Sequence, residues 1–177
     1  MADVAETIEQ SARRTGHHAW LEMRLFEILG RWSGTVAEPR ARVLFATHSQ
    51  HHAWHAELWH GLLPALPHLA AADLVAPDEA DAAVVAALET LDDAATEARL
   101  TAIYGDTLPH VARSYGAHLA LTTPVTDGPA IRALRLALAD LDADLAAGEA
   151  LVAALSPEAD VDRGGGGARP APGAAAP

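Results

Sequence analysis

The sequence contains no cysteine, lysine or asparagine, and aromatic residues make up only 5% of its 177 positions. Without cysteine the chain cannot build a disulfide scaffold, a thiolate zinc site, an iron–sulfur cluster or a thiol nucleophile. The formal net charge is -12 and every permanent positive charge is an arginine, so the basic footprint that a phosphate backbone requires is missing. We therefore expect no nucleic-acid partner.

Long apolar runs are also missing. No stretch approaches the roughly 18 uninterrupted apolar residues of a membrane span. The opening MADVAETIEQSARRTG lacks the basic-then-apolar order of a signal peptide. The glycine-rich segment GGGGARPAPGAAAP has no lysine and no strand–turn–helix context, so it is not a phosphate-binding loop. We expect a cytoplasmic protein with no membrane partner and no nucleotide or flavin cofactor.

The chain is rich in alanine and leucine, which favour helices, whereas strand-forming residues are sparse. Glycine and proline mark the ends of the helical segments. They predict four long helices, the third of which is kinked at residues 105–109. The predicted helices cover residues 4–32, 38–63, 77–121 and 127–155, with a proline-rich connector at 64–77 and a turn at 122–126.

These segments predict an all-α protein. The short connections favour a four-helix bundle domain over residues 1–157, and an irregular helical domain is the alternative. Residues 158–177 are predicted to form a disordered tail, because they offer almost no bulky apolar side chain to bury.

Histidine is the unusual component, with 10 residues in the chain. Rotation by about 100° per residue places four of them within one arc of the second predicted helix: His48, His51, His52 and His55. The apolar residues of this helix share that arc, whereas Ser49 falls on the opposite side. Four imidazoles are therefore predicted to face the core.

The other predicted helices also place polar groups on or beside their apolar stripes. The first carries His18 and Glu22, one turn apart, the third carries Glu97 beside Tyr104, and the fourth carries Asp142 on its flank. An unpaired buried carboxylate is costly, so Glu22 needs a partner. The interior is thus predicted to collect donors from all four helices.

Mixed imidazole and carboxylate donors suit a divalent transition metal, namely iron, manganese, zinc or copper. Such an ion would offset the carboxylate charge and give each imidazole lone pair an acceptor. Asp140 and Asp144 lie farther round the fourth helix and are predicted to face outward. The predicted metal ligands are His18, Glu22, His48, His51, His52, His55, Glu97 and Asp142.

Four segments give the chain a resemblance to a known superfamily: HHAWLEMRLFEILGRW, THSQHHAWHAELWHGLLP, RLTAIYGDTLPHVARSYGAHLALTTPVTDGP and IRALRLALADLDADLAAGEALVAAL. Their layout resembles the ferritin-like superfamily, in its rubrerythrin-like and small actinobacterial-type members. The resemblance implies a four-helix bundle that holds metal in its core. Members with two metals use a Glu from each of two helices and a Glu-x-x-His pair from each of the other two.

The chain departs from that ligand pattern in its second and fourth helices. Glu22 corresponds to the first Glu and Glu97 to a third-helix ligand. In the second helix, however, the only Glu-x-x-His pair is Glu57 with His60, and both are predicted to face outward. In the fourth, a leucine stands where a His would follow Asp142. A complete di-iron site and its ferroxidase, peroxide-reducing or oxygenase activity are therefore not carried over.

Several interpretations of the histidine cluster remain open. The cluster is either a mononuclear metal site, a buried polar network with Glu22, Tyr104 and Asp142, or the lining of a homodimer seam or pore mouth. Three functions are considered: a bundle with a non-standard, histidine-rich metal site, a non-catalytic structural or interaction bundle, and a metal-dependent enzyme such as an oxidase or hydrolase. Trp20 or Trp54 is predicted to mark a contact in a homodimer or higher homo-oligomer.

Overall fold

The computed structural model describes residues 7–155, which are largely helical and form no strand. The all-α class is therefore confirmed, while the predicted domain boundary at 157 and the tail at 158–177 lie outside the described residues. The elements are α1 (Ile8–Thr35), α2 (Pro39–Gly61), α3 (Ala71–Leu74), α4 (Glu79–Glu89), α5 (Thr96–Leu100), the π-helix η1 (Thr101–Thr107), α6 (Leu108–Leu121) and α7 (Gly128–Leu155).

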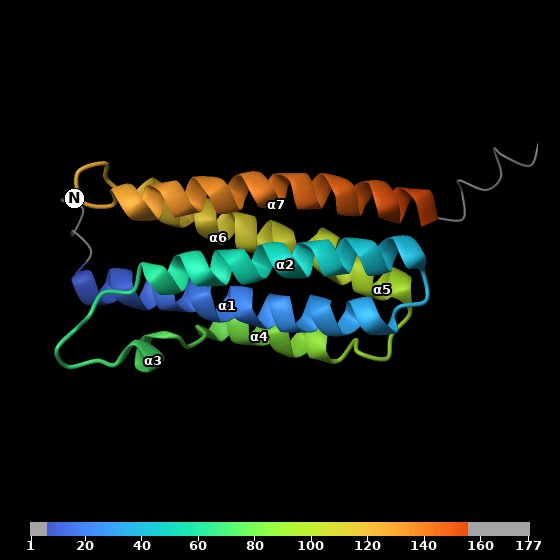
Figure 1. Ribbon diagram of the computed structural model, residues 1–177, viewed down its shortest axis with the longest axis horizontal. Coiled ribbons are helices and arrows are strands. Elements are labelled where there is room, and N and C mark those ends of the chain that lie inside the picture. The colour runs from blue at the N-terminus through green and yellow to red at the C-terminus, as the bar shows by residue number, and fades with distance from the viewer. Residues whose placement is uncertain (1–6, 156–177) are drawn as a thin grey trace, which may run out of the picture.

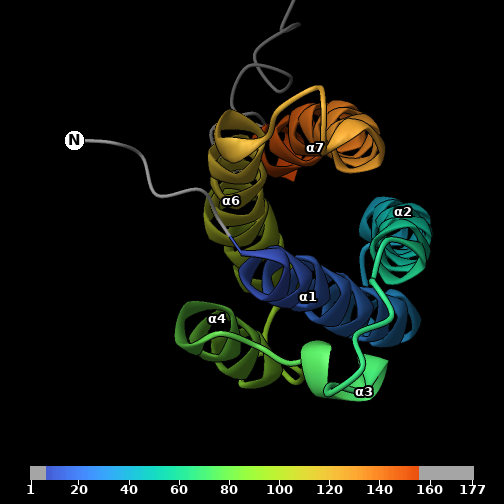
Figure 2. The same ribbon diagram turned by 90° about the vertical axis from the view of Figure 1, so that its left-hand side faces the viewer.

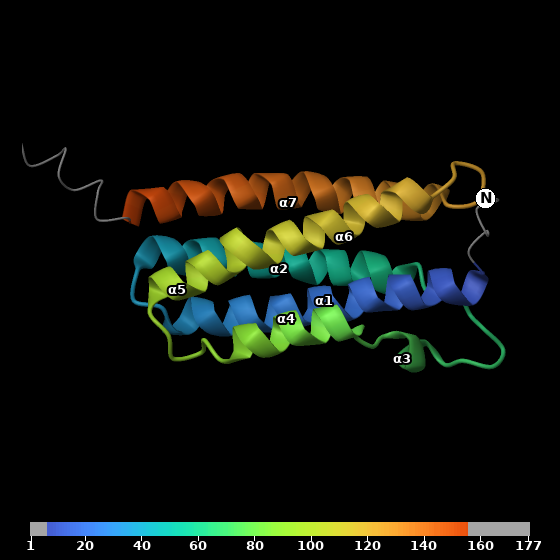
Figure 3. The same cartoon turned by 180° about the vertical axis from the view of Figure 1, so that it is seen from behind.

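The long helices run side by side along one axis (Figure 1). Seen along that axis, α1, α2, α6 and α7 surround a common interior, whereas α3 and α4 lie against the outer side of α1 (Figure 2). From behind, α5 to α6 form one oblique rod that ends beside α7 (Figure 3). Between residues 7 and 155, no helix has both the length and the apolar character that a membrane span needs.

Side chains at the helix starts explain why these segments begin where they do. Thr7 and Gln10 form a capping box at α1. Glu38 accepts a hydrogen bond from the amide of Arg40, and Pro39 occupies the first turn of α2. Asp78 accepts from the amide of Asp81 at the start of α4, 2.8 Å away. The predicted starts of the second and third helices are confirmed within two residues.

The prediction of one continuous third helix over 77–121 is wrong. The chain leaves helical geometry between α4 and α5, where the buried Arg99 donates to the carbonyl oxygens of Leu91 (3.0 Å) and Asp92. The Asp92 carboxylate in turn accepts from Arg31 and from the indole of Trp32, both on α1. The hydrogen bonds from Arg99 pair the backbone carbonyl oxygens at the break, and the contacts of Asp92 attach it to α1. The interruption is therefore stabilised by tertiary contacts.

At residues 105–109, where the kink was predicted, the chain passes from the π-helix η1 into α6. Because η1 is a π-helix, its backbone does not pair every carbonyl oxygen that would accept a hydrogen bond in an α-helix. The Thr107 hydroxyl donates to the carbonyl oxygen of Ala102, 2.8 Å away. Tyr104 lies at the centre of η1 and is buried. The rod therefore continues past Pro109 without ending there.

The connector at 64–77 contains the short helix α3, which the sequence did not predict. The end of α3 packs directly on α1 at Gly16, where an added Cβ would lie 3.2 Å from the amide nitrogen of Val75 and closer still to the Leu74 carbonyl. Only glycine allows this close approach. The contact fixes the connector against the outer side of α1.

The α1–α2 pair makes the most extensive contact between any two elements of the described chain. Ser49 is buried in this contact and donates from its hydroxyl to the carbonyl oxygen of Phe26, 2.9 Å away. The prediction that Ser49 faces outward is therefore wrong, because α1 covers a wider arc of α2 than the apolar stripe suggested. The two helices behave as one packed hairpin that carries the central polar cluster.

Candidate metal centre

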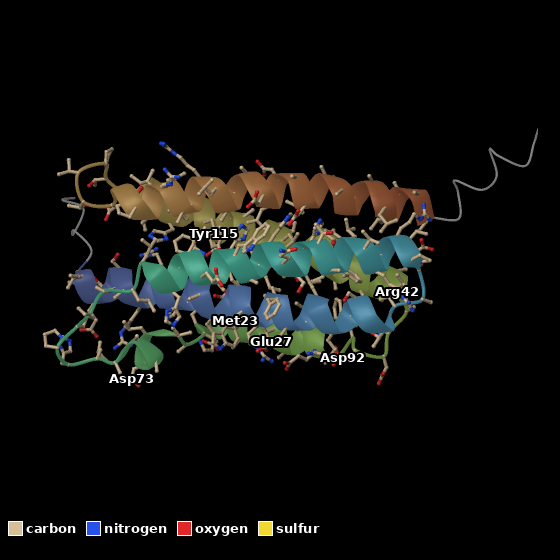
Figure 4. The ribbon with its side chains drawn as sticks, viewed as in Figure 1. Met23, Glu27, Arg42, Asp73, Asp92 and Tyr115 are labelled. Carbon is tan, nitrogen blue, oxygen red and sulfur yellow. The ribbon has the colours of Figure 1, made fainter. Side chains whose placement is uncertain are left out.

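Glu22 is a fully buried carboxylate at the middle of α1. Its Oε2 lies 2.5 Å from Nδ1 of His52 on α2. Its Oε1 accepts a hydrogen bond from the hydroxyl of Tyr115 on α6, and that hydroxyl accepts from the indole of Trp59, 2.9 Å away. Figure 4 shows Tyr115 pointing into the interior between the long helices. Three helices thus fix the orientation of this carboxylate.

His55 brings a second imidazole to the same carboxylate. Its Nδ1 lies 3.4 Å from Oε1 of Glu22, and its Nε2 lies 3.0 Å from Oδ2 of Asp140 on α7. One donor atom from each of Glu22, His52 and His55 lies within 4.8 Å of the other two. Around an ion with bonds of about 2.1 Å, tetrahedral donors are about 3.4 Å apart. The separations of up to 4.8 Å exceed this spacing by about 1.4 Å, so the side chains must move closer for these three groups to share one ion.

Two imidazole nitrogens in this cluster have no hydrogen-bond partner. They are Nε2 of His52 and Nδ1 of His55, and their residues are 0% and 1% exposed. A buried polar atom without a partner costs about 1–3 kcal/mol. Nδ1 of His55 faces the Glu22 carboxylate, whereas Nε2 of His52 lies on the other side of its ring from the nitrogen that contacts Glu22.

The electrostatics of the cluster reflect this arrangement. Burial by itself would raise the pKa of Glu22, but the imidazoles of His52 and His55 hold that pKa below its ordinary value. Burial would lower the pKa of His55, yet the carboxylates of Glu22 and Asp140 raise it to about 9. The surroundings therefore keep Glu22 ionised and favour positive charge beside it, whether from a proton or from a metal ion.

A second polar cluster lies one helical turn away on α2, and its members are paired with one another by hydrogen bonds. The buried carboxylate of Asp144 on α7 lies 3.1 Å from Nε2 of His48 and 3.0 Å from Nδ1 of His51. The other ring nitrogen of His48 lies 2.8 Å from the hydroxyl of Tyr104. Burial lowers the pKa of His48 to about 4, although Asp144 opposes the shift. This cluster satisfies its own polar atoms without an ion.

His18 lies at the α6 side of the interior and pairs with another imidazole. Its Nε2 is 3.0 Å from Nδ1 of His118, so one of these nitrogens donates and the other accepts. Burial and the neighbouring His118 lower the pKa of His18 to about 3. His18 is therefore neutral at physiological pH, and its ring also packs against Trp59 and Tyr115.

The structure separates the eight predicted ligands into three groups. Glu22, His52 and His55 meet at one point, whereas the other three histidines bind partners elsewhere, as described above. Glu97 and Asp142 are exposed, so their predicted approach to the cluster is wrong. The group that could hold an ion comes from α1 and α2, whereas the third and fourth predicted helices bring other polar groups to the interior, namely Tyr104, Tyr115 and Asp144.

Sequence reasoning missed the carboxylates that α7 contributes to both clusters. Asp144 was predicted to face outward but is buried, and Asp140 contacts His55 from the edge of the interior. The two aspartates are four residues apart, as are His51 and His55, their partners on an antiparallel helix. This matched spacing is the signal in the sequence that could have revealed the α2–α7 seam.

Comparison of the chain with family models, with curated proteins and with solved structures finds no match.

Proposed function

We propose that the protein is a ferritin-like four-helix bundle that binds one divalent transition metal ion at Glu22, His52 and His55. In this proposal α1, α2, the rod from α5 to α6, and α7 are the four helices. Two imidazoles with one carboxylate form a donor set used for zinc and for ferrous iron. The observation that carries the proposal is the buried carboxylate of Glu22 with two buried imidazoles, one donor atom of each residue lying within 4.8 Å of the other two.

The burial of the three donors favours metal binding over catalysis on a large substrate. A catalytic metal needs an open coordination position that the substrate can reach. Glu22 and His52 are fully buried and His55 is 1% exposed. We therefore propose a structural or storage role for the ion.

Metal content and thermal stability test the proposal together. The untagged protein should contain about one ion of zinc, iron, manganese or copper per chain by elemental analysis. Removing that ion with a chelator should lower Tm, and returning it at about 100 times Kd should restore about 2.7 kcal/mol. For a domain of this size that is a shift of about 5–11 °C.

A matched pair of variants locates the ion. Glu22→Gln removes the central charge while keeping the side-chain shape, and Glu57→Gln makes the same change at an exposed position on α2. The first should lose the metal and the Tm response, and the second should keep both. Metal far below one ion per chain, with no Tm response to any of the four ions, would refute the proposal.

A second candidate function is a non-catalytic interaction module, and one surface favours it. Val43, Trp54 and Leu58 are exposed on α2, where they fall within about 60° of one another. Exposed apolar side chains that share a face are typical of protein contacts. If this candidate is right, the protein will be indifferent to chelators, and Trp54→Ser will change its mass in light scattering from an oligomer to a monomer.

A further inference from the structure

Asp140 is the residue of α7 that contacts the proposed metal site. Glu22 belongs to α1, and His52 and His55 belong to α2, so the proposed ligands all lie on one helical hairpin. Oδ2 of Asp140 lies 3.0 Å from Nε2 of His55. The Asp140 side chain is 48% exposed whereas His55 is 1% exposed, so this carboxylate links a buried ring to the surface.

The two nitrogens of His55 face different groups, and this difference decides how the ring can bind an ion. Nδ1 makes an ion-pair contact of 3.4 Å with Oε1 of Glu22 that lacks hydrogen-bond geometry, whereas Nε2 lies 3.0 Å from Asp140. An imidazole that binds a metal through Nδ1 keeps one proton, which must be on Nε2. The carboxylate of Asp140 is in place to accept that proton in a hydrogen bond.

We propose that Asp140 is a positioning residue, which holds the His55 ring with its proton on Nε2 and its Nδ1 lone pair directed at the ion; the proposal rests on the metal site described above. Without this acceptor the ring can also carry its proton on Nδ1 or turn about its side-chain bonds. Either change removes a donor from the ion. Carboxylates that orient a metal-binding imidazole in this way raise metal affinity by about 10–100-fold.

The contact between Asp140 and His55 also couples the position of α7 to whether the proposed site holds a metal ion. The described contacts of α7 with the histidines of α2 are the ion pairs of Asp140 and Asp144. Asp144 engages His48 and His51, which lie outside the proposed ligand set. An ion bound to His55 therefore acts on α7 through Asp140, and metal binding should protect the middle of α7 from hydrogen exchange.

The test compares metal affinity in variants of the full chain. Asp140→Ala removes the acceptor, Asp140→Asn keeps an oxygen that can accept but loses the charge, and Asp142→Ala is a matched control. Asp142 is an exposed carboxylate on the same helix, so this control makes the same charge change without touching His55. Kd is measured for Co²⁺ by its visible absorption and for Zn²⁺ by competition with a chelating indicator.

We expect Asp140→Ala to weaken binding of both ions by about 10–100-fold, Asp140→Asn to weaken it less, and Asp142→Ala to change it less than about twofold. The Tm of the metal-free protein should be lower in Asp140→Ala than in Asp142→Ala, because the buried Nε2 of His55 loses its partner, so Kd is measured well below both transitions. Equal affinities in Asp140→Ala and Asp142→Ala would overturn the positioning role while leaving the metal site intact. Absence of metal binding by the unmodified chain would instead refute the proposed function.

Discussion

Replacing Gly148 with alanine will destabilise the protein, although the same change usually stabilises a helix. Gly148 lies in the interior of α7, directly over the ring of Tyr104. A Cβ added there would lie 2.6 Å from Cδ2 of that ring and closer still to Cγ and Cδ1. The Tyr104 ring must therefore move, and its hydrogen bond with His48 is lost with it.

The opposing contributions can be compared in magnitude. Alanine gains about 1 kcal/mol over glycine in a helix interior. Overpacking in a buried position costs about 1–3 kcal/mol. Leaving the buried His48 nitrogen without its partner costs about 1–3 kcal/mol more. The net loss is about 1–5 kcal/mol, which lowers Tm by at least 2 °C for a domain of this size.

Gly116 supplies the control, because it lies in α6, is exposed, and has no atom within 4 Å of an added Cβ. Gly116→Ala should raise the free energy of unfolding by about 1 kcal/mol. The two variants therefore shift the urea midpoint in opposite directions. If Gly148→Ala and Gly116→Ala stabilise the protein equally, Tyr104 is not packed against α7 as described. The hydrogen bond between Tyr104 and His48 would then not depend on that packing.

Two further predictions concern the polar interior. Burial places the pKa of His48 at about 4 and that of His18 at about 3, against 6.5 in the unfolded chain. The unfolded state then binds more protons below pH 6.5, so the free energy of unfolding should fall as pH drops from about 6.5 toward 4. Urea titrations at several pH values check this, and an unchanged slope in His18→Gln would contradict it. Tyr115→Phe leaves the Trp59 indole without its acceptor and Glu22 without a donor, so it should cost about 1–3 kcal/mol. A change below about 0.5 kcal/mol in the same assay would show that these bonds do not form.

The helices were largely predictable because their signals are local. Proline and capping side chains mark the starts of α2 and α4, and no long-range contact is needed to read them; the predicted start of the first helix at residue 4 lies outside the described residues. The break between α4 and α5 has no such signal. It depends on Arg99 donating to the freed carbonyl oxygens of Leu91 and Asp92, and on the exposed pair that Asp92 makes with Arg31, which is distant in the sequence.

Part of the candidate site was also predictable. The periodicity of α2 places His52 and His55 on the core stripe, and the cost of burying Glu22 unpaired predicts that it meets them. Each of these two predictions uses information from a single helix, the first from α2 and the second from α1. Glu97 was placed inward by the same reasoning and is exposed, because the interruption before α5 and the π-turn change the rotation of that segment.

The sequence by itself therefore determined that the chain is helical and that imidazoles face its interior, because helix caps and a 3.6-residue period act within a single element. Only the tertiary structure decided which carboxylate each imidazole meets. Asp142 and Asp144 are neighbours in the sequence but point about 160° apart on α7. The rotation of α7 against α2 selects Asp144 for His48, and the antiparallel register assigns Asp140 to His55.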